Sequence, residues 1–178
     1  MNDHDSVARM RRLTDLDLSW CLCFNRATQK QGLERLFAIV SRLGDGIFWY
    51  CLMGCLLLVQ GGPALPVVGR MLAAGAICLI LYQWLKAKTT RARPCARSAS
   101  IRATVLPLDE YSFPSGHTLH AVAFSVVAIC HYPRLAWLVL PFTALVALSR
   151  LVLGLHYPSD VLAGALLGAG LAGLVMQW

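Results

Sequence analysis

Charged side chains are scarce in this chain: 14% of its 178 residues are charged, whereas 57% are hydrophobic. That balance excludes an ordinary soluble domain. The length is enough for one domain. We therefore expect apolar segments of roughly 20 residues, the length that a helix needs to cross the hydrocarbon core of a membrane.

Acidic residues are scarcer than basic ones, with nine Asp and Glu against sixteen Lys and Arg. No acidic cluster is present that could hold a magnesium ion. The net charge of +7 suits contacts with anionic lipids or with an anionic substrate. The basic residues match no nucleic-acid-binding motif, so we expect no nucleic-acid partner.

The chain also lacks a disulfide pattern, because its seven cysteines are odd in number and most lie inside apolar runs. Cys51 and Cys55 share a helical face, but no histidine or carboxylate lies near them at ligand spacing. We therefore expect no metal ion and no cofactor. The polar, charged N-terminus does not fit a cleavable signal peptide.

Five apolar segments predict an all-α fold, an integral membrane bundle of about five transmembrane helices. The predicted spans are Leu36–Val59, Val67–Leu85, Ser115–His131, Leu135–Leu153 and Pro158–Trp178. Arg42 and Asp45, in the first span, should lie at the membrane interface or face the bundle interior. Small residues recur in the last span at Gly164, Gly168 and Ala172, which predicts that a neighbouring helix packs closely there.

Residues 1–33 form a less apolar region that precedes the predicted transmembrane domain, residues 34–178. We expect a mobile tail over residues 1–12. Leu13–Arg26 is predicted to be an amphipathic helix with apolar residues at helical spacing, namely Leu13, Leu16, Trp20 and Phe24. This helix should lie in the membrane interface or, equally, pack on the end of the bundle.

The order of the spans brings three polar stretches to one side of the membrane. These stretches are the connection Lys86–Pro114, the start of the third span, and the junction between the fourth and fifth spans. The short turns around Gly62 and Tyr132 lie on the opposite side. A connection as long as Lys86–Pro114 is usually functional in so compact a chain.

The first polar stretch carries four cations, Lys86, Lys88, Arg91 and Arg93. A phosphate dianion needs several donors, and lysine and arginine at a dry membrane edge supply them. Taken alone, the stretch is explained as well by a basic loop that binds lipid head groups.

The second stretch, Phe113-Pro114-Ser115-Gly116-His117, opens the third span. Because Pro114 suits a helix start, the backbone N–H groups of Ser115, Gly116 and His117 should be unpaired and form an anion site. His117 beside this site can protonate a leaving oxygen. The alternative is a polar helix cap without further function.

The third stretch joins the fourth and fifth spans and carries Arg150, His156 and Asp160. Pro158 suits the first turn of the last helix, which places Asp160 in that turn. Its carboxylate can accept the Nδ1–H of His156 and leave Nε2 free as a nucleophile. Arg150 is a forked donor for a phosphate. Each residue alone has an ordinary structural explanation, but their meeting on one side favours a phosphoryl-transfer site.

The two other histidines of the spans lack such support. We expect His120 to be a helix-face residue near the site and His131 to be an interfacial residue. Neither is assigned a catalytic role.

The three stretches together resemble a known signature. Their shared pattern is Lys86, six residues, then Arg93-Pro94; Pro114-Ser115-Gly116-His117; and Ser149-Arg150, five residues, His156, three residues, then Asp160. This pattern resembles the three-part signature of the type 2 phosphatidic acid phosphatase superfamily, over roughly residues 36–175. That family includes lipid phosphate phosphatases, bacterial phosphatidylglycerophosphate and undecaprenyl pyrophosphate phosphatases, glucose-6-phosphatase and vanadium haloperoxidases.

The resemblance implies a role for each signature residue. His156 is the nucleophile that becomes phosphohistidine, Asp160 orients it, and His117 is the general acid. The implied phosphate-binding residues are Lys86, Arg93, Ser115, Gly116 and Arg150. Catalysis in this family is independent of metal ions, in agreement with the missing acidic cluster.

We therefore expect an integral membrane phosphatase that hydrolyses a lipid phosphate or a polyprenyl pyrophosphate in the bacterial plasma membrane. A lipid phosphotransferase would use the same residues. A haloperoxidase would hold vanadate with them, but those relatives are soluble. A non-enzymatic lipid-binding or scrambling membrane protein is the alternative from another class. The lipid head group and the oligomeric state are not set by the sequence.

The orientation in the membrane receives two opposite predictions. Of the sixteen Lys and Arg residues, only Arg70 and Arg134 lie on the side away from the site, so the positive-inside rule places the site in the cytoplasm. Most bacterial members of the family that the chain resembles look outward-facing, with the active site on the outer side of the membrane. On that resemblance we expect the site of this chain on the outer face. Many of these family members also resemble six-span proteins, whereas residues 1–33 are too polar for an extra span.

Overall fold

A computed structural model of the chain describes the backbone of residues 3–106 and 109–177, and side chains from residue 14 onward within these ranges. Every regular element in the described residues is helical, apart from one antiparallel bridge between Ala92 and Tyr111. The α-helices are α1 (Asp3–Asn25), α2 (Gln31–Arg42), α3 (Phe48–Gln60), α4 (Leu65–Thr89), α5 (Pro94–Arg97), α6 (Gly116–His131), α7 (Ala136–Val152) and α8 (Pro158–Val175). The predicted all-α class is confirmed.

The first predicted span is bent. Helices α2 and α3 are joined by a π-helical segment, Leu43–Ile47, in which Asp45 and Gly46 leave helical geometry. Gly46 has a φ of +120°, a conformation that favours glycine. Gly44 packs so closely on α7 that a Cβ would come 2.7 Å from a methyl carbon of Val146. The kink turns the Asp45 side chain toward the end of the bundle that carries the polar stretches.

Among the described residues, four helical stretches are long and apolar enough to cross a membrane: Gln31–Gln60, Gly62–Thr89, Pro133–Val152 and Pro158–Val175. The remaining predicted span corresponds to α6, which has 16 residues and is apolar. Helix α6 packs against α4, α7 and α8 and is therefore the central helix of the bundle. Because its neighbours surround it, α6 does not need the full length of a lipid-facing span.

The small-residue stripe on α8 packs against α6, as the sequence predicts. A Cβ on Gly164 would come 2.7 Å from the carbonyl oxygen of Ser115. A Cβ on Gly168 would clash with the carbonyl oxygen of Leu119 one turn further along α6. These contacts hold the start of α8 beside the start of α6.

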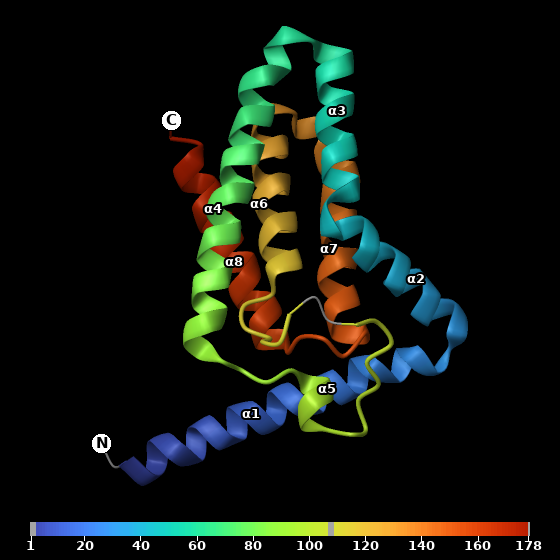
Figure 1. Cartoon of the computed structure of the whole chain (residues 1–178), viewed down its shortest axis with the longest axis vertical. Helices are drawn as coiled ribbons and strands as arrows, with labels where there is room; N and C mark the ends of the chain where they lie inside the picture. Colours follow the sequence, from blue (N-terminus) through green and yellow to red (C-terminus); the bar gives the residue numbers. More distant parts are fainter. Residues whose placement is uncertain (1–2, 107–108, 178) are drawn as a thin grey trace.

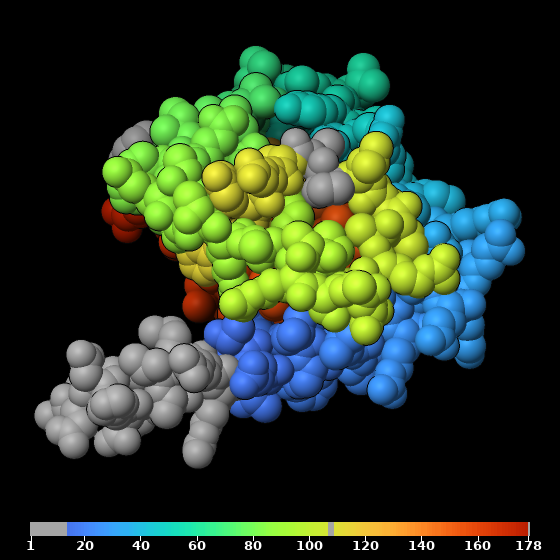
Figure 2. Space-filling view, turned by 60° about the horizontal axis from the view of Figure 1, so that its bottom comes forward, coloured from blue at the N-terminus to red at the C-terminus, as the bar shows by residue number. Residues whose placement is uncertain are grey.

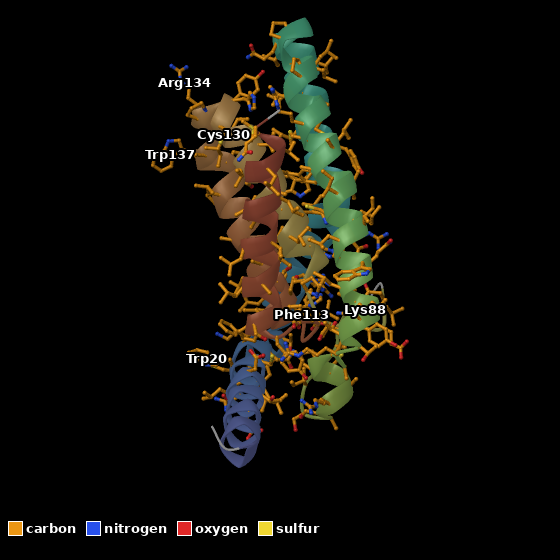
Figure 3. All side chains as sticks on the ribbon, turned by 90° about the vertical axis from the view of Figure 1, so that its left-hand side faces the viewer. Trp20, Lys88, Phe113, Cys130, Arg134 and Trp137 are labelled. Carbon is orange, nitrogen blue, oxygen red and sulfur yellow. The ribbon has the colours of Figure 1, made fainter. Side chains whose placement is uncertain are left out.

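The three polar stretches meet at one end of the bundle, and the predicted sidedness is confirmed. The connection after α4, the start of α6 and the α7–α8 junction lie together at the lower end in Figure 1. Figure 3 shows Lys88 and Phe113 at this end, and Cys130, Arg134 and Trp137 at the opposite end.

Helix α1 crosses the same end of the bundle (Figure 1) and lies beside the connection after α4 when the bundle is seen from below (Figure 2). It begins at Asp3, so residues 3–12 of the predicted tail are helical, while residues 1–2 lie outside the described part. No proline or glycine interrupts this stretch of sequence. Leu16 and Trp20 are more than half exposed.

Candidate active site

A cavity of about 750 Å³ lies at the polar end of the bundle, between α3, α4 and α6. Six of the eight predicted site residues line it: Lys86, Arg93, Gly116, His117, Arg150 and His156. The other two, Ser115 and Asp160, are fully buried and are not among the lining residues. Its volume falls in the range of small-molecule sites.

His156 lies in the turn between α7 and α8, and each of its ring nitrogens has a hydrogen-bond partner. Nδ1 is 2.7 Å from the carbonyl oxygen of Ser112, to which it donates. This fixes the tautomer and leaves the lone pair on Nε2. Nε2 is 3.3 Å from Nη1 of Arg93 at the cavity wall. Nε2 therefore carries the lone pair of the ring at the wall of the cavity.

Asp160 does not make the predicted hydrogen bond to His156. Its Oδ2 is 3.7 Å from Nδ1 of His156 and instead accepts the backbone N–H of Tyr157 at 2.9 Å. Oδ1 accepts from Nη1 of Arg91 at 2.6 Å. The Ser112 carbonyl takes the position that the carboxylate was expected to hold, and Asp160 lies 3.7 Å from the imidazole without a hydrogen bond to it.

Burial and neighbouring cations keep His156 neutral. Burial, followed by the positive charges of Arg150, Arg93 and Lys86, lowers the pKa of His156 well below its ordinary value, against the opposing hydrogen bond to Ser112. A neutral imidazole is the form that attacks phosphorus.

Three cations surround the cavity beside His156. Lys86 Nζ donates to Asp109 Oδ2 at 2.5 Å, and Arg93 Nη2 donates to Asp109 Oδ1 at 2.7 Å. Burial alone would raise the pKa of Asp109, but the hydrogen bond and charge of Lys86, with those of Arg93, lower it overall. Asp109 is therefore an anion held by two of the predicted phosphate ligands.

Arg150 is the third cation and is almost fully buried. Its Nη1 donates to Ser41 Oγ at 2.5 Å. Within the described residues its Nε has no hydrogen-bond partner. Because an unpaired buried donor is costly, this N–H at the cavity wall fits a site for an anion.

The start of α6 differs in part from the prediction. The N–H of Ser115 is not unpaired, since it donates to the carbonyl oxygen of Asp160 at 3.1 Å. Its hydroxyl lies 3.0 Å from that of Thr118 and is turned away from the cavity. Gly116 and His117 occupy the first turn and line the cavity, where a helix leaves its N–H donors without intrahelical partners.

His117 faces an acidic residue from the kinked span. Its Nε2 is 3.6 Å from Oδ1 of Asp45, and both residues line the cavity. The sequence placed Asp45 at the interface or in the bundle interior without linking it to His117. A charge inside an apolar span was the available signal.

Other functional contacts were missed for different reasons. Asp109 belongs to the acidic pair in the long connection, and Arg91 to its basic run, but neither pattern names a partner. Ser112 acts through its backbone carbonyl, for which a sequence carries no signal.

The two other histidines of the spans lie on α6, and His120 is near the site as expected. His120 lines the cavity and has its ring nitrogens near the carbonyl oxygens of Gly116 and Gly75, at 2.9 and 3.2 Å. His131 lies at the far end of α6, with Nε2 3.3 Å from Arg70.

Comparisons with known proteins find a matching family model and similar phosphatases. The family model described as the PAP2 superfamily matches residues 65–178. The chain is 29% identical over 150 residues to the undecaprenyl-diphosphatase of Sulfolobus acidocaldarius, covering 82% of this chain and 70% of that protein. It is 33% identical over 132 residues to the decaprenylphosphoryl-5-phosphoribose phosphatase of Mycobacterium tuberculosis, covering 71% of each.

A solved structure has the same fold. It is the transmembrane PAP2-type phosphatidylglycerolphosphate phosphatase of Bacillus subtilis, with a TM-score of 0.74 and 24% identity. The match covers 93% of this chain and 85% of that one.

Proposed function

The chain belongs to the PAP2 superfamily, and from this membership we propose that it hydrolyses a lipid phosphate or a polyprenyl pyrophosphate through a phosphohistidine on His156. It is an integral membrane lipid phosphate hydrolase. The observation that carries the mechanism is the position of Nε2 of His156, which faces a cation-lined cavity while Ser112 holds Nδ1.

Each step can be assigned to a side chain. Nε2 of His156 attacks phosphorus, an N–P bond forms, and the P–O bond to the lipid breaks as His117 gives its proton to the leaving oxygen. Water then attacks the phosphoenzyme, the N–P bond breaks, inorganic phosphate leaves, and His117 takes the proton of the water. Lys86, Arg93 and Arg150 neutralise the charge on the transferring group. The phosphate displaces Asp109 from the two cations that it occupies.

The lipid chain has a place beside the phosphate. The cavity wall continues along apolar residues of α3 and α4, including Trp49, Leu72, Ala76 and Leu79. Leu72 and Leu79 are 51% and 43% exposed, so this wall reaches the lipid-facing surface. The chain of the substrate lies between α3 and α4 while its phosphate meets the cations. Two relatives named for polyprenyl-linked phosphates support such a substrate class.

The test is phosphate release by the detergent-purified protein in the presence of EDTA. Substrates are phosphatidic acid, phosphatidylglycerophosphate and undecaprenyl pyrophosphate. His156→Ala should lower the rate by about 10⁴-fold or more, as for loss of a nucleophile. His131→Ala, at the far end of α6, is the matched control and should retain full activity. Full activity of His156→Ala would refute the mechanism, and transfer of phosphate to a second lipid, seen by mass spectrometry, would identify a phosphotransferase.

We place the site on the outer face of the bacterial plasma membrane, on the family resemblance and against the charge distribution. Lys88 and Arg134 are both exposed and lie at opposite ends of the bundle (Figure 3). In a cysteine-free background, Lys88→Cys should react with an impermeant maleimide in intact cells, and Arg134→Cys should react only after lysis. The reverse pattern would place the site in the cytoplasm.

A further inference from the structure

The inward face of α1 reaches the catalytic turn through a chain of charges. Asp17 Oδ2 lies 2.6 Å from Nη2 of Arg91, and Nη1 of the same guanidinium lies 2.6 Å from Oδ1 of Asp160. The other oxygen of Asp160 lies 3.7 Å from Nδ1 of His156. A residue of the N-terminal helix is thereby connected to the proposed nucleophile through two ion pairs and a buried carboxylate.

Burial and further contacts hold the side chains of Asp17, Arg91 and Asp160 in place. The Asp160 side chain is fully buried, and those of Asp17 and Arg91 are 11% and 27% exposed. The guanidinium of Arg91 lies 4.0 Å above the ring of Tyr157. Asp17 also accepts the N–H of Ser159 at 3.1 Å, together with its hydroxyl, at the start of α8. A carboxylate from another helix therefore satisfies donors in the first turn of α8.

Charge balance gives these contacts a consequence for His156. Arg91 alone would neutralise the buried carboxylate of Asp160. Asp17 offsets the charge of Arg91, so the group of three retains one net negative charge beside the imidazole. A negative charge there stabilises the positive imidazole of a phosphohistidine and opposes the cations on the cavity side.

We propose that Asp17 and Arg91 are both positioning residues: Arg91 holds Asp160 beside His156, and Asp17 holds Arg91 and restores the negative charge behind the imidazole, which makes α1 a functional part of the site. This rests on the proposed function of His156 as nucleophile. Neither residue lines the cavity, so neither touches the substrate. Their effect therefore belongs to kcat rather than to KM.

Other contacts of α1 allow the proposal to be tested without unfolding the site. The thiol of Cys21 donates to the carbonyl oxygen of His156 at 3.7 Å, and burial, then Asp17 and Asp160, raise the pKa of this thiol to about 12. Asn25 donates to the carbonyl oxygen of Val152 at 2.8 Å and accepts from the N–H of Arg102 at 2.9 Å. These bonds keep α1 attached when Asp17 loses its charge.

The experiment compares Asp17→Asn, Asp15→Asn and Arg91→Gln in the full chain with a lipid phosphate substrate. Asp15 is exposed and lies two residues away on α1, so its variant is a matched control for charge loss. Asp17→Asn should lower kcat about tenfold, the usual effect of losing a residue that orients a reacting group through another side chain. It should leave KM within about twofold. Asp15→Asn should match the unchanged protein in kcat and KM.

The pH profile separates positioning from simple anchoring. The charged groups that face His156 are Lys86, Arg93, Arg150 and Asp160, with His117 across the cavity. Loss of Asp17 makes the potential at His156 more positive, so the acidic limb of kcat/KM should move to lower pH by roughly half a unit. Arg91→Gln removes a positive charge and should move it to higher pH.

Several outcomes would overturn the proposal. The first is an Asp17→Asn variant whose kcat equals that of Asp15→Asn. The second is an acidic limb of kcat/KM that stays at the same pH in Asp17→Asn. The third is a shift of this limb in the same direction in Asp17→Asn and Arg91→Gln. If Arg91→Gln does not fold, the kcat of Asp17→Asn and the pH of its acidic limb of kcat/KM still test the proposal. Failure of the proposed function itself would look different, because His156→Ala would then retain activity.

Discussion

His117 and Asp45 face each other at the cavity wall, with 3.6 Å between Nε2 and Oδ1. A general acid must carry a proton when the lipid oxygen leaves, and a carboxylate beside an imidazole favours the protonated form. Asp45→Asn should therefore slow hydrolysis of a lipid phosphate about tenfold to a hundredfold. A substrate with an acidic leaving group, p-nitrophenyl phosphate, needs no proton and should be hydrolysed at nearly the unchanged rate.

The comparison of these two substrates is the measurement, and Glu110→Gln, a charge loss at an exposed position outside the cavity wall, is its control. Equal losses on both substrates would show that Asp45 supports the site in some other way than through the proton of His117.

At the scale of single residues, spacing along the chain predicted which side chains meet but not the atoms through which they bind. Lys86, Arg93, Arg150 and His156 were expected together and do line one cavity. The bond that fixes the imidazole comes from the Ser112 carbonyl, because the fold of the connection, and not its side chains, places that oxygen.

At the scale of elements, the contact between α6 and α8 sets the distance between the two halves of the site. Gly164 lies one turn after Asp160, and a Cβ there would come 2.7 Å from the carbonyl oxygen of Ser115, which is backbone and cannot give way. Gly164→Ala should lower stability by about 1–3 kcal/mol, the usual cost of overpacking, and should also lower kcat.

Thermal unfolding in detergent and the rate of phosphate release measure the two effects. Gly170→Ala on the same helix is the control, because a Cβ there meets no atom within 4 Å. It should be neutral or stabilising, by up to about 1 kcal/mol. A Gly164→Ala variant as stable and active as the unchanged protein would contradict the role of this contact.

Apolar length and periodicity predicted the long apolar helices of the bundle. They predicted less well the features that depend on packing between particular helices. The small residues of α8 predicted a close neighbour, and α6 is that neighbour. The kink at Leu43–Ile47, where Gly46 takes a φ of +120° and Gly44 contacts Val146, was not predicted from the sequence. Helix α1 packs on the bundle end through Cys21 and Asn25, and the sequence left that placement equal to an interfacial one.

At the scale of the whole molecule, the order of five spans was sufficient to bring the three signature stretches to one end of the bundle. It was not sufficient to show how a lipid reaches them. That depends on α3 and α4, whose facing residues form an apolar wall that continues from the cations to the lipid-facing surface. The phosphate and the chain of one substrate can therefore be bound on different sides of the same cavity.

A bulky residue on this wall should separate the two parts of substrate binding. Ala76 lines the cavity from α4, whereas Ile80, one turn further, is 69% exposed and does not line it. Ala76→Trp would displace about two methylene groups of the chain from apolar surface, at about 0.8 kcal/mol each, and should raise KM for a polyprenyl substrate about tenfold. Hydrolysis of water-soluble p-nitrophenyl phosphate should be unchanged, because the cations and His156 are untouched. Ile80→Trp should leave both substrates unaffected. If Ala76→Trp slowed both equally, the chain would have to lie elsewhere, and α3 and α4 would serve only to hold the cavity open.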